Sequence, residues 1–140
     1  MPTRLNRAWN NFVMRSSAAS YEQGSSKRAA AIANLFMGAS YNGGLNSFLT
    51  STHDLDANEV VDALTALGAS KAAHQLKTVL QGLGAPLPAS TQDERWKRLE
   101  EQWHEGLDEY DVLTEEADRE LMEVLEKHVT ANEVFYSRLD

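Results

Sequence analysis

The hydrophobic residues of this 140-residue chain recur at intervals of three and four, which is the period of an amphipathic α-helix. No segment sustains the alternation of β-branched and polar residues that is typical of a half-buried strand. We therefore predict an all-α fold, a compact bundle of about seven helices without a sheet. With 42% hydrophobic residues the chain can bury one core, so residues 1–140 are expected to form a single domain.

Neutral to basic helices are expected over about residues 1–81. The first helix is predicted to run from about Thr3 to Ser16. Its apolar face consists of Leu5, Trp9, Phe12 and Val13. Capping residues and glycines delimit three more helices, from Ser25 or Ser26 to about Gly38, from Asp56 to Gly68, and from Ser70 to Gly82 or Gly84.

A turn is predicted at Tyr41-Asn42-Gly43-Gly44, because asparagine and glycine tolerate the left-handed backbone that tight turns need. A short helix from Leu45 to Leu49 is expected to follow, with Leu45 and Phe48 anchored in the core. The sequence therefore indicates a structural motif, which comprises Asn42, Gly43, Gly44, Leu45 and Phe48.

Residues 82–90 are predicted to form a Gly/Pro-rich loop within the domain, and acidic helices are expected over residues 91–140. A capping box of Thr91 and Glu94 begins a helix that we predict to continue to Tyr110. Its apolar stripe consists of Trp96, Leu99, Trp103 and Leu107. Thr114 is expected to cap the last long helix, which continues or bends near Thr130 to reach Phe135 and Tyr136.

The net charge of −8 comes from the last third of the chain. Residues 1–90 hold 7 Lys/Arg and 5 Asp/Glu, whereas residues 91–140 hold 6 Lys/Arg and 16 Asp/Glu. Such a field repels nucleic acid and attracts basic partners, so we expect no direct binding of nucleic acid. The predicted partner-binding carboxylates are Glu94, Glu101, Glu105, Asp108, Glu116, Glu120 and Glu123.

Carboxylates four residues apart on a helix lie about 6 Å apart along its axis, a spacing comparable with that of neighbouring phosphates on one DNA strand. Acidic helix faces are also ordinary solubilising surface, and this interpretation remains open. Few lysines or arginines follow the acids at the fourth position, so the pattern is not the one that helix stability alone would favour.

The chain lacks the residues that several kinds of metal, cofactor and nucleophile chemistry require. The chain has no cysteine, which excludes disulfides, thiolate zinc sites and cysteine nucleophiles. The four histidines stand on different predicted elements, and the single Glu101-x-x-His104 motif lacks the second motif of a di-iron bundle. Gly43-Gly44 is not followed by the lysine of a phosphate loop. We predict no metal site and no cofactor.

His53 and Asp54 could form an acid–base pair, with a hydroxyl of Ser47, Ser51 or Thr52 as nucleophile. In a loop between helices, such a cluster more often caps helices and turns the chain. We therefore predict a non-catalytic protein and keep an enzyme around His53 and Asp54 as an alternative.

No segment resembles a membrane anchor or a secretory signal. Arg4, Arg7 and Arg15 interrupt the N-terminal apolar residues, and the most apolar run, Ala29 to Ala39, is shorter than the about 20 residues of a membrane helix. Together with the lack of cysteine, these features predict a cytoplasmic location.

The segments Tyr41–Leu49, Glu59–Ala69 and Ala72-Ala73 resemble a bacterial family of acidic DNA-mimic proteins. The shared pattern is Asn-Gly-Gly, a hydrophobic residue, two free positions and an aromatic, then a helix ending in Leu-Gly-Ala before an Ala-rich helix. The resemblance covers residues 30–82 well and weakens toward the C-terminus. It implies an all-helical fold, no known catalytic activity, possible homodimers, and the occupation of a transcription factor's DNA-binding surface.

The leading hypothesis is a DNA-mimic-type regulator of transcription whose acidic helices engage a basic DNA-binding protein. The main alternative is an immunity or anti-defence interaction module that binds its partner through an apolar or aromatic face.

Overall fold

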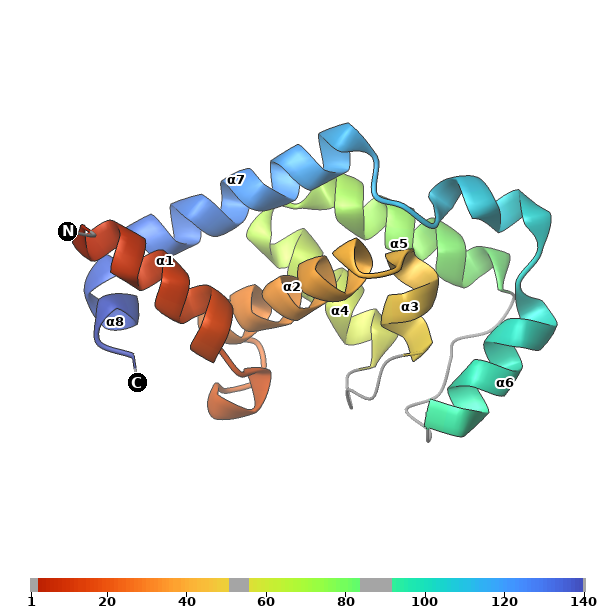
Figure 1. The fold of residues 1–140 in the computed structure, drawn as a ribbon, viewed down its shortest axis with the longest axis horizontal. Helices are drawn as coiled ribbons and strands as arrows, with labels where there is room; N and C mark the ends of the chain where they lie inside the picture. Colours follow the sequence, from red (N-terminus) through yellow and green to blue (C-terminus); the bar gives the residue numbers. More distant parts are fainter. Residues whose placement is uncertain (1–2, 51–55, 84–91, 140) are drawn as a thin grey trace.

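The computed structural model describes residues 3–50, 56–83 and 92–139, which contain eight α-helices, two 3₁₀ helices and no strand (Figure 1). The predicted all-α class is confirmed, with the short terminal and 3₁₀ helices adding to the about seven that the periodicity indicates. In chain order the elements are α1 (Arg4–Arg15), η1 (Ala18–Ser20), α2 (Ser26–Tyr41), α3 (Gly44–Thr50), α4 (Ala57–Leu67), α5 (Ser70–Gly82), α6 (Gln92–Gln102), η2 (Glu105–Tyr110), α7 (Glu115–Ala131) and α8 (Glu133–Ser137).

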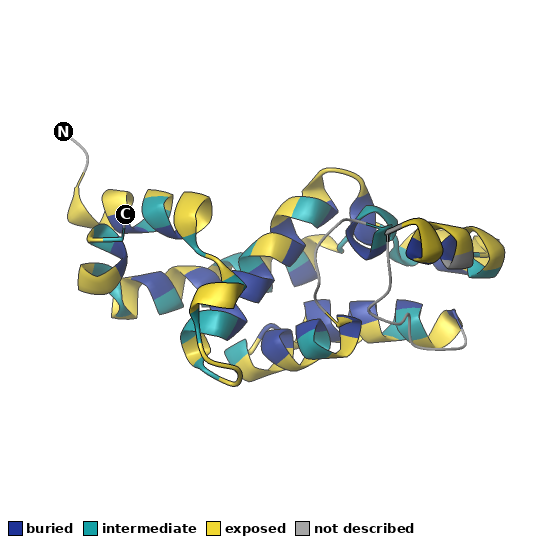
Figure 2. Ribbon diagram, turned by 90° about the horizontal axis from the view of Figure 1, so that it is seen from below, coloured by how far each residue is buried: buried dark blue, intermediate teal, exposed yellow. Residues whose placement is uncertain are grey.

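Helix α2 lies at the centre of the core and packs against α3, α4, α7 and η1. It is buried around most of its circumference, because the alanines at positions 29, 30, 31 and 33 let neighbouring helices approach on several sides. Phe36 extends the core toward α3, where its ring meets Phe48 edge to face at 5.0 Å. One continuous cluster of buried hydrophobic residues extends from α1 to α8, and the exposed residues lie on the outer helix faces (Figure 2).

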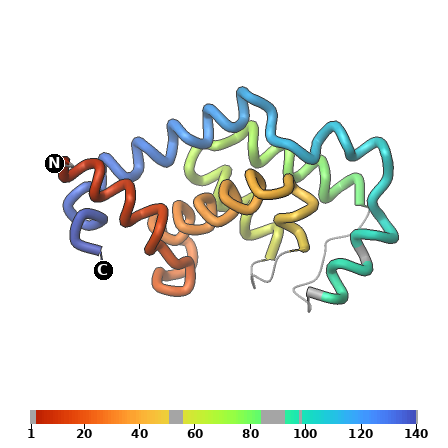
Figure 3. Tube along the Cα trace, viewed as in Figure 1, coloured from red at the N-terminus to blue at the C-terminus, as the bar shows by residue number. Residues whose placement is uncertain are grey.

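The two ends of the chain lie side by side, because α1 packs on α7 and α8 (Figure 3). Phe12 meets Tyr136 edge to face at 5.1 Å, and Asn11 Nδ2 donates to the Tyr136 carbonyl oxygen at 2.9 Å. The predicted apolar face of this helix is only partly right: Phe12 is buried, but Leu5 and Val13 are exposed and Ala8 is buried instead. A small residue at position 8 lets α1 approach its neighbours closely.

Most predicted helix starts are confirmed by capping bonds. The side chains of Ser25, Asp56 and Thr114 accept from backbone amides two or three residues ahead. The predicted helix from Ser70 to Gly82 is confirmed as α5, although its capping position is occupied by Ala69, which has no side-chain acceptor. Gly38 does not end α2, which continues to Tyr41.

The predicted continuous helix from Thr91 to Tyr110 is wrong in the part that the structure describes; Thr91 itself lies outside the described residues. Helix α6 ends at Gln102, the backbone at His104 is extended, and η2 follows. The Trp103 indole Nε1 donates to Asp108 at 2.8 Å, and Leu107 turns inward to occupy the space beside Gly82. These contacts form where the predicted helix would have continued beyond Gln102. Of the predicted apolar stripe, Leu99 and Leu107 are buried, whereas Trp96 is exposed.

Within the described ranges, no helix is both long and apolar enough to cross a membrane.

Candidate acidic interface

Among the described helices, α7 carries the most acids, and it lies along the outside of the bundle, above α2 and α5 (Figure 1). One face is buried through Ala117, Leu121, Leu125 and Val129, which recur at the spacing of one helix turn. Acids in the first turn favour the helix, since their negative charge faces the positive end of the helix dipole. The carboxylates of α7 are Glu115, Glu116, Asp118, Glu120, Glu123 and Glu126.

Asp111 and Asp118 lie near the start of α7. Both accept hydrogen bonds from residues at the junction of α2 and α3. The Asp111 carboxylate accepts from the Asn46 amide at 2.8 Å, and its carbonyl accepts from the Leu45 amide at 2.7 Å. The Tyr41 hydroxyl donates to Asp118. Burial and this hydrogen bond raise the pKa of Tyr41 to about 12, so the phenol remains a donor even above its ordinary pKa of 10.0.

Two further carboxylates are held in the same way by uncharged donors. Glu120 accepts from the backbone amide of Lys71 at 2.8 Å and thus supplies the cap that Ala69 cannot give to α5. Asp108 accepts from the Trp103 indole. An uncharged donor fixes the position of a carboxylate without neutralising its charge. We refer to Asp108, Asp111, Asp118 and Glu120 as the oriented carboxylates.

Ion pairs, in contrast, compensate charge at the start of α7. Lys71 Nζ lies 3.6 Å from Glu116, and Arg119 lies 3.2 Å from Glu115. All four side chains are exposed, so each pair is expected to contribute less than about 1 kcal/mol and to exchange with solvent ions.

The seven predicted carboxylates do not form one row. Glu94 and Glu101 lie on α6, which extends away from α7 at the other end of the molecule (Figure 1). Glu105 and Asp108 lie on η2, and Glu116, Glu120 and Glu123 lie on α7. Among the described residues, no hydrogen bond or ion pair reaches the exposed carboxylates of Glu101, Glu105 and Glu123. We define the acidic interface as Asp108, Asp111, Glu115, Glu116, Asp118, Glu120 and Glu123.

Sequence reasoning missed three members of this interface, Asp111, Glu115 and Asp118. It also missed Gln75, a buried residue of α5 whose amide nitrogen donates to the carbonyls of Tyr110 at 2.8 Å and Val112 at 2.7 Å. Its oxygen accepts from the Thr114 amide at 3.2 Å. Gln75 therefore holds the segment that carries Asp111. The one local signal was a glutamine among the apolar positions of α5.

The predicted motif lies directly against the interface. Leu45 and Phe48 are fully buried, and Gly44 has a φ of +84°. A Cβ at Gly44 would stand 2.5 Å from the Asp111 carbonyl oxygen, so only glycine fits here. Asn42 follows α2 as its C-terminal cap, and its amide donates to the Ala39 carbonyl at 3.2 Å.

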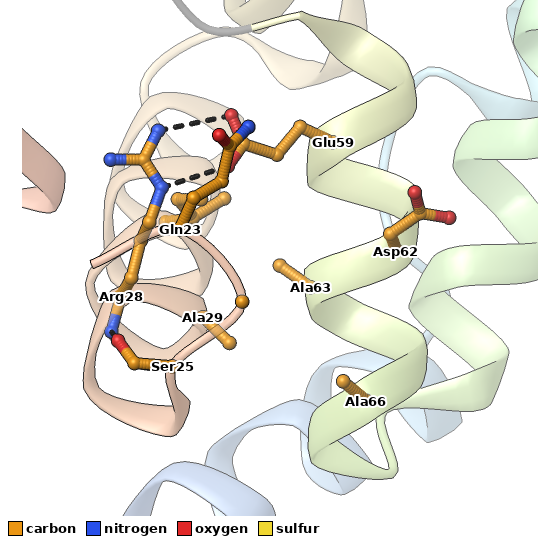
Figure 4. Close-up of a pocket in the computed structure, with 10 residues that line it drawn as sticks. Gln23, Ser25, Arg28, Ala29, Glu59, Asp62, Ala63 and Ala66 are labelled. Carbon is orange, nitrogen blue, oxygen red and sulfur yellow. Dashed lines mark hydrogen bonds and ion pairs between the residues drawn. The ribbon is translucent and has the colours of Figure 1, made fainter. Parts of the chain in front are cut away.

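A pocket of about 270 Å³ lies between the start of α2 and α4, away from the acidic interface (Figure 4). The Arg28 guanidinium donates to both carboxylate oxygens of Glu59, at 2.8 and 3.0 Å, and also to the Ala18 carbonyl. This contact lowers the pKa of Glu59. Because the charged pair is mutually satisfied and also joins η1 to the bundle, we assign it a structural role.

The residues considered for catalysis and metal binding are placed as follows. His53 and Asp54 lie outside the described residues. His104 Nε2 lies 3.2 Å from the Gly82 carbonyl oxygen, and Glu101 is exposed. In the described ranges, no group of three or more metal-ligating side chains converges.

These features define an all-helical protein with an acidic surface on its outer helix. Donors from the same chain fix the oriented carboxylates of this surface. The family model described as DMP19-like protein matches residues 25–136, and the chain belongs to this family. Searches of curated proteins and of solved structures found no match.

Proposed function

We propose that this protein is a non-catalytic, DNA-mimic-type regulator whose acidic interface binds the basic surface of a DNA-binding protein. The observation that carries the proposal is the set of oriented carboxylates, each fixed by an uncharged donor. DNA presents its negative charges at fixed positions, so a protein that imitates it gains affinity when its carboxylates are already ordered. Membership of the DMP19-like family and the excess of acids in residues 91–140 support the same function.

The expected mechanism is competition. A partner bound to the acidic interface has its own DNA-binding surface covered, so free partner and DNA occupancy both fall. The interaction weakens as salt rises, because added ions shorten the Debye length and screen the attraction between the exposed charges of the two surfaces. The proposal includes the cytoplasmic location expected from the sequence and the possible homodimer that the family resemblance implies.

The test begins with immobilised protein and a lysate of the source cell at low salt, followed by elution in a salt gradient and mass spectrometry. A protein captured in this way is then assayed for DNA binding with and without the regulator. The informative variant is Asp108→Asn with Asp118→Asn, because asparagine still accepts the Trp103 and Tyr41 hydrogen bonds but carries no charge.

The matched control is Glu22→Gln with Asp62→Asn, which removes two charges from exposed positions of the first part of the chain. We expect D108N/D118N to weaken partner binding about two- to thirtyfold and E22Q/D62N to leave it nearly unchanged. Equal effects of both variants would show that only net charge matters, and salt-insensitive binding would contradict the proposal.

The alternative, an immunity or anti-defence module with an aromatic face, is favoured by one observation: Trp96 is 54% exposed. Capture of a partner without a basic surface, retained at high salt, would support this alternative.

A further inference from the structure

Trp96 is a 54% exposed aromatic residue on α6. The exposed ring of Phe135 lies 4.7 Å from Lys27 Nζ, and the hydroxyl of Tyr41 binds Asp118. No ring contact or hydrogen bond among the described residues involves Trp96. Exposed indoles are costly to leave in water and are enriched among the residues that dominate binding energy.

The side of α6 that enters the core explains this exposure. Leu99 and the residue one turn earlier, Arg95, are buried against the rest of the bundle, where α6 packs on α3. Trp96 is rotated by about 100° from Arg95 around the helix. The indole is therefore held at the surface by the burial of its neighbours.

Two exposed acids share the face of Trp96. Asp93 lies three residues before it and Glu100 four residues after it, and both spacings place side chains next to each other on a helix. Lys97 is exposed close by, but no ion pair in the described part of the chain joins it to either acid. The face therefore combines a half-exposed aromatic ring with a carboxylate at each end.

We propose that Asp93, Trp96 and Glu100 form a docking face for an arginine side chain of the basic partner, in addition to the contacts of the acidic interface. The guanidinium stacks on the indole while its N–H groups reach the flanking carboxylates. Arginine suits this face better than lysine because its planar cation is weakly hydrated and stacks on aromatic rings. This inference rests on the proposed function. The negative charges beside the indole complement the positive charge of an arginine side chain.

The test uses two fluorescein-labelled peptides of equal length and charge, one of oligo-arginine and one of oligo-lysine, titrated with the full-length protein at low salt. Fluorescence anisotropy reports both affinities. The variants are Trp96→Ala and, as a matched control, Val112→Ala, which truncates another exposed apolar side chain outside α6. Circular dichroism verifies that each variant keeps its helical content.

We expect the wild type to bind the arginine peptide about two- to fivefold more tightly than the lysine peptide. W96A should remove this preference by weakening the arginine peptide alone, and V112A should retain it. D93N/E100Q should weaken both peptides, because the carboxylates attract either cation.

The experiment distinguishes failure of the docking face from failure of the proposed function. Equal affinities in the wild type, with W96A unchanged, would overturn the docking face and leave the proposed function intact. Absence of binding by both peptides at low salt would contradict the proposed function as well.

Discussion

Gly44 and Asp111 approach each other so closely that the space beside the glycine Cα is filled by the carbonyl and carboxylate oxygens of the aspartate. This contact joins the turn after α2 to the segment before α7. It positions Asp111 to accept from the amides of Leu45 and Asn46. The predicted motif and the acidic interface are therefore parts of one structural unit.

We expect Gly44→Ala to destabilise the protein by about 2–4 kcal/mol, because alanine is strained at a φ of +84° and its Cβ displaces Asp111 from the start of α3. Urea unfolding followed by circular dichroism measures the loss. Gly24→Ala is the control, since Gly24 has the same φ but open space around it. If both variants lost the same stability, the Asp111 contact would have no energetic role.

Gln75 offers a second test of how the interface is supported. Gln75→Leu leaves the carbonyls of Tyr110 and Val112 and the Thr114 amide without their partner, so we expect a loss of about 2–4 kcal/mol. Hydrogen exchange should also increase at the start of α7. Gln81→Leu, an exposed change on the same helix, should alter the free energy of unfolding by less than about 0.5 kcal/mol. Equal stability of the two variants would contradict the role of Gln75.

The sequence predicted those features that depend on residues close together in the chain. The caps of Ser25, Asp56 and Thr114 are of this kind, because each bond reaches only two or three residues ahead. The positive φ at Gly44 is equally local.

Features that depend on tertiary contacts were missed. Nothing near Gly44 indicates that Asp111 will approach it. The periodicity favoured burial of Trp96, but α6 packs through Arg95 and Leu99 instead. It also favoured a helix to Tyr110, but Leu107 packs beside Gly82 after α6 has ended. Carboxylates were predicted by their number and spacing, whereas Asp111, Asp118 and Glu120 are distinguished by donors that lie far away in the chain.

Ionisation of Tyr41 should lower stability at high pH. Burial and the bond to Asp118 raise its pKa to about 12, above the ordinary 10.0, so between these values the unfolded chain has already released the proton that the folded chain still holds. The free energy of unfolding must therefore fall as pH rises through this interval. Tyr41→Phe should lose less stability over the same interval and should lack one late step in an ultraviolet tyrosinate titration. Identical pH profiles of the two proteins would contradict the raised pKa.

His128 should make the junction of α1, α7 and α8 sensitive to acid. Burial, aided by the nearby positive charge of Lys27, lowers the pKa of His128 below its ordinary 6.5, and the imidazole Nε2 lies 2.8 Å from the Tyr136 hydroxyl. As pH falls below 6.5, the unfolded chain binds a proton before the folded chain does, so stability decreases until pH passes the lowered value. Lys27→Met should shift the folded pKa of His128 part of the way back. NMR titration of the imidazole measures it, and a value at or above 6.5 in the wild type would contradict the effect of burial.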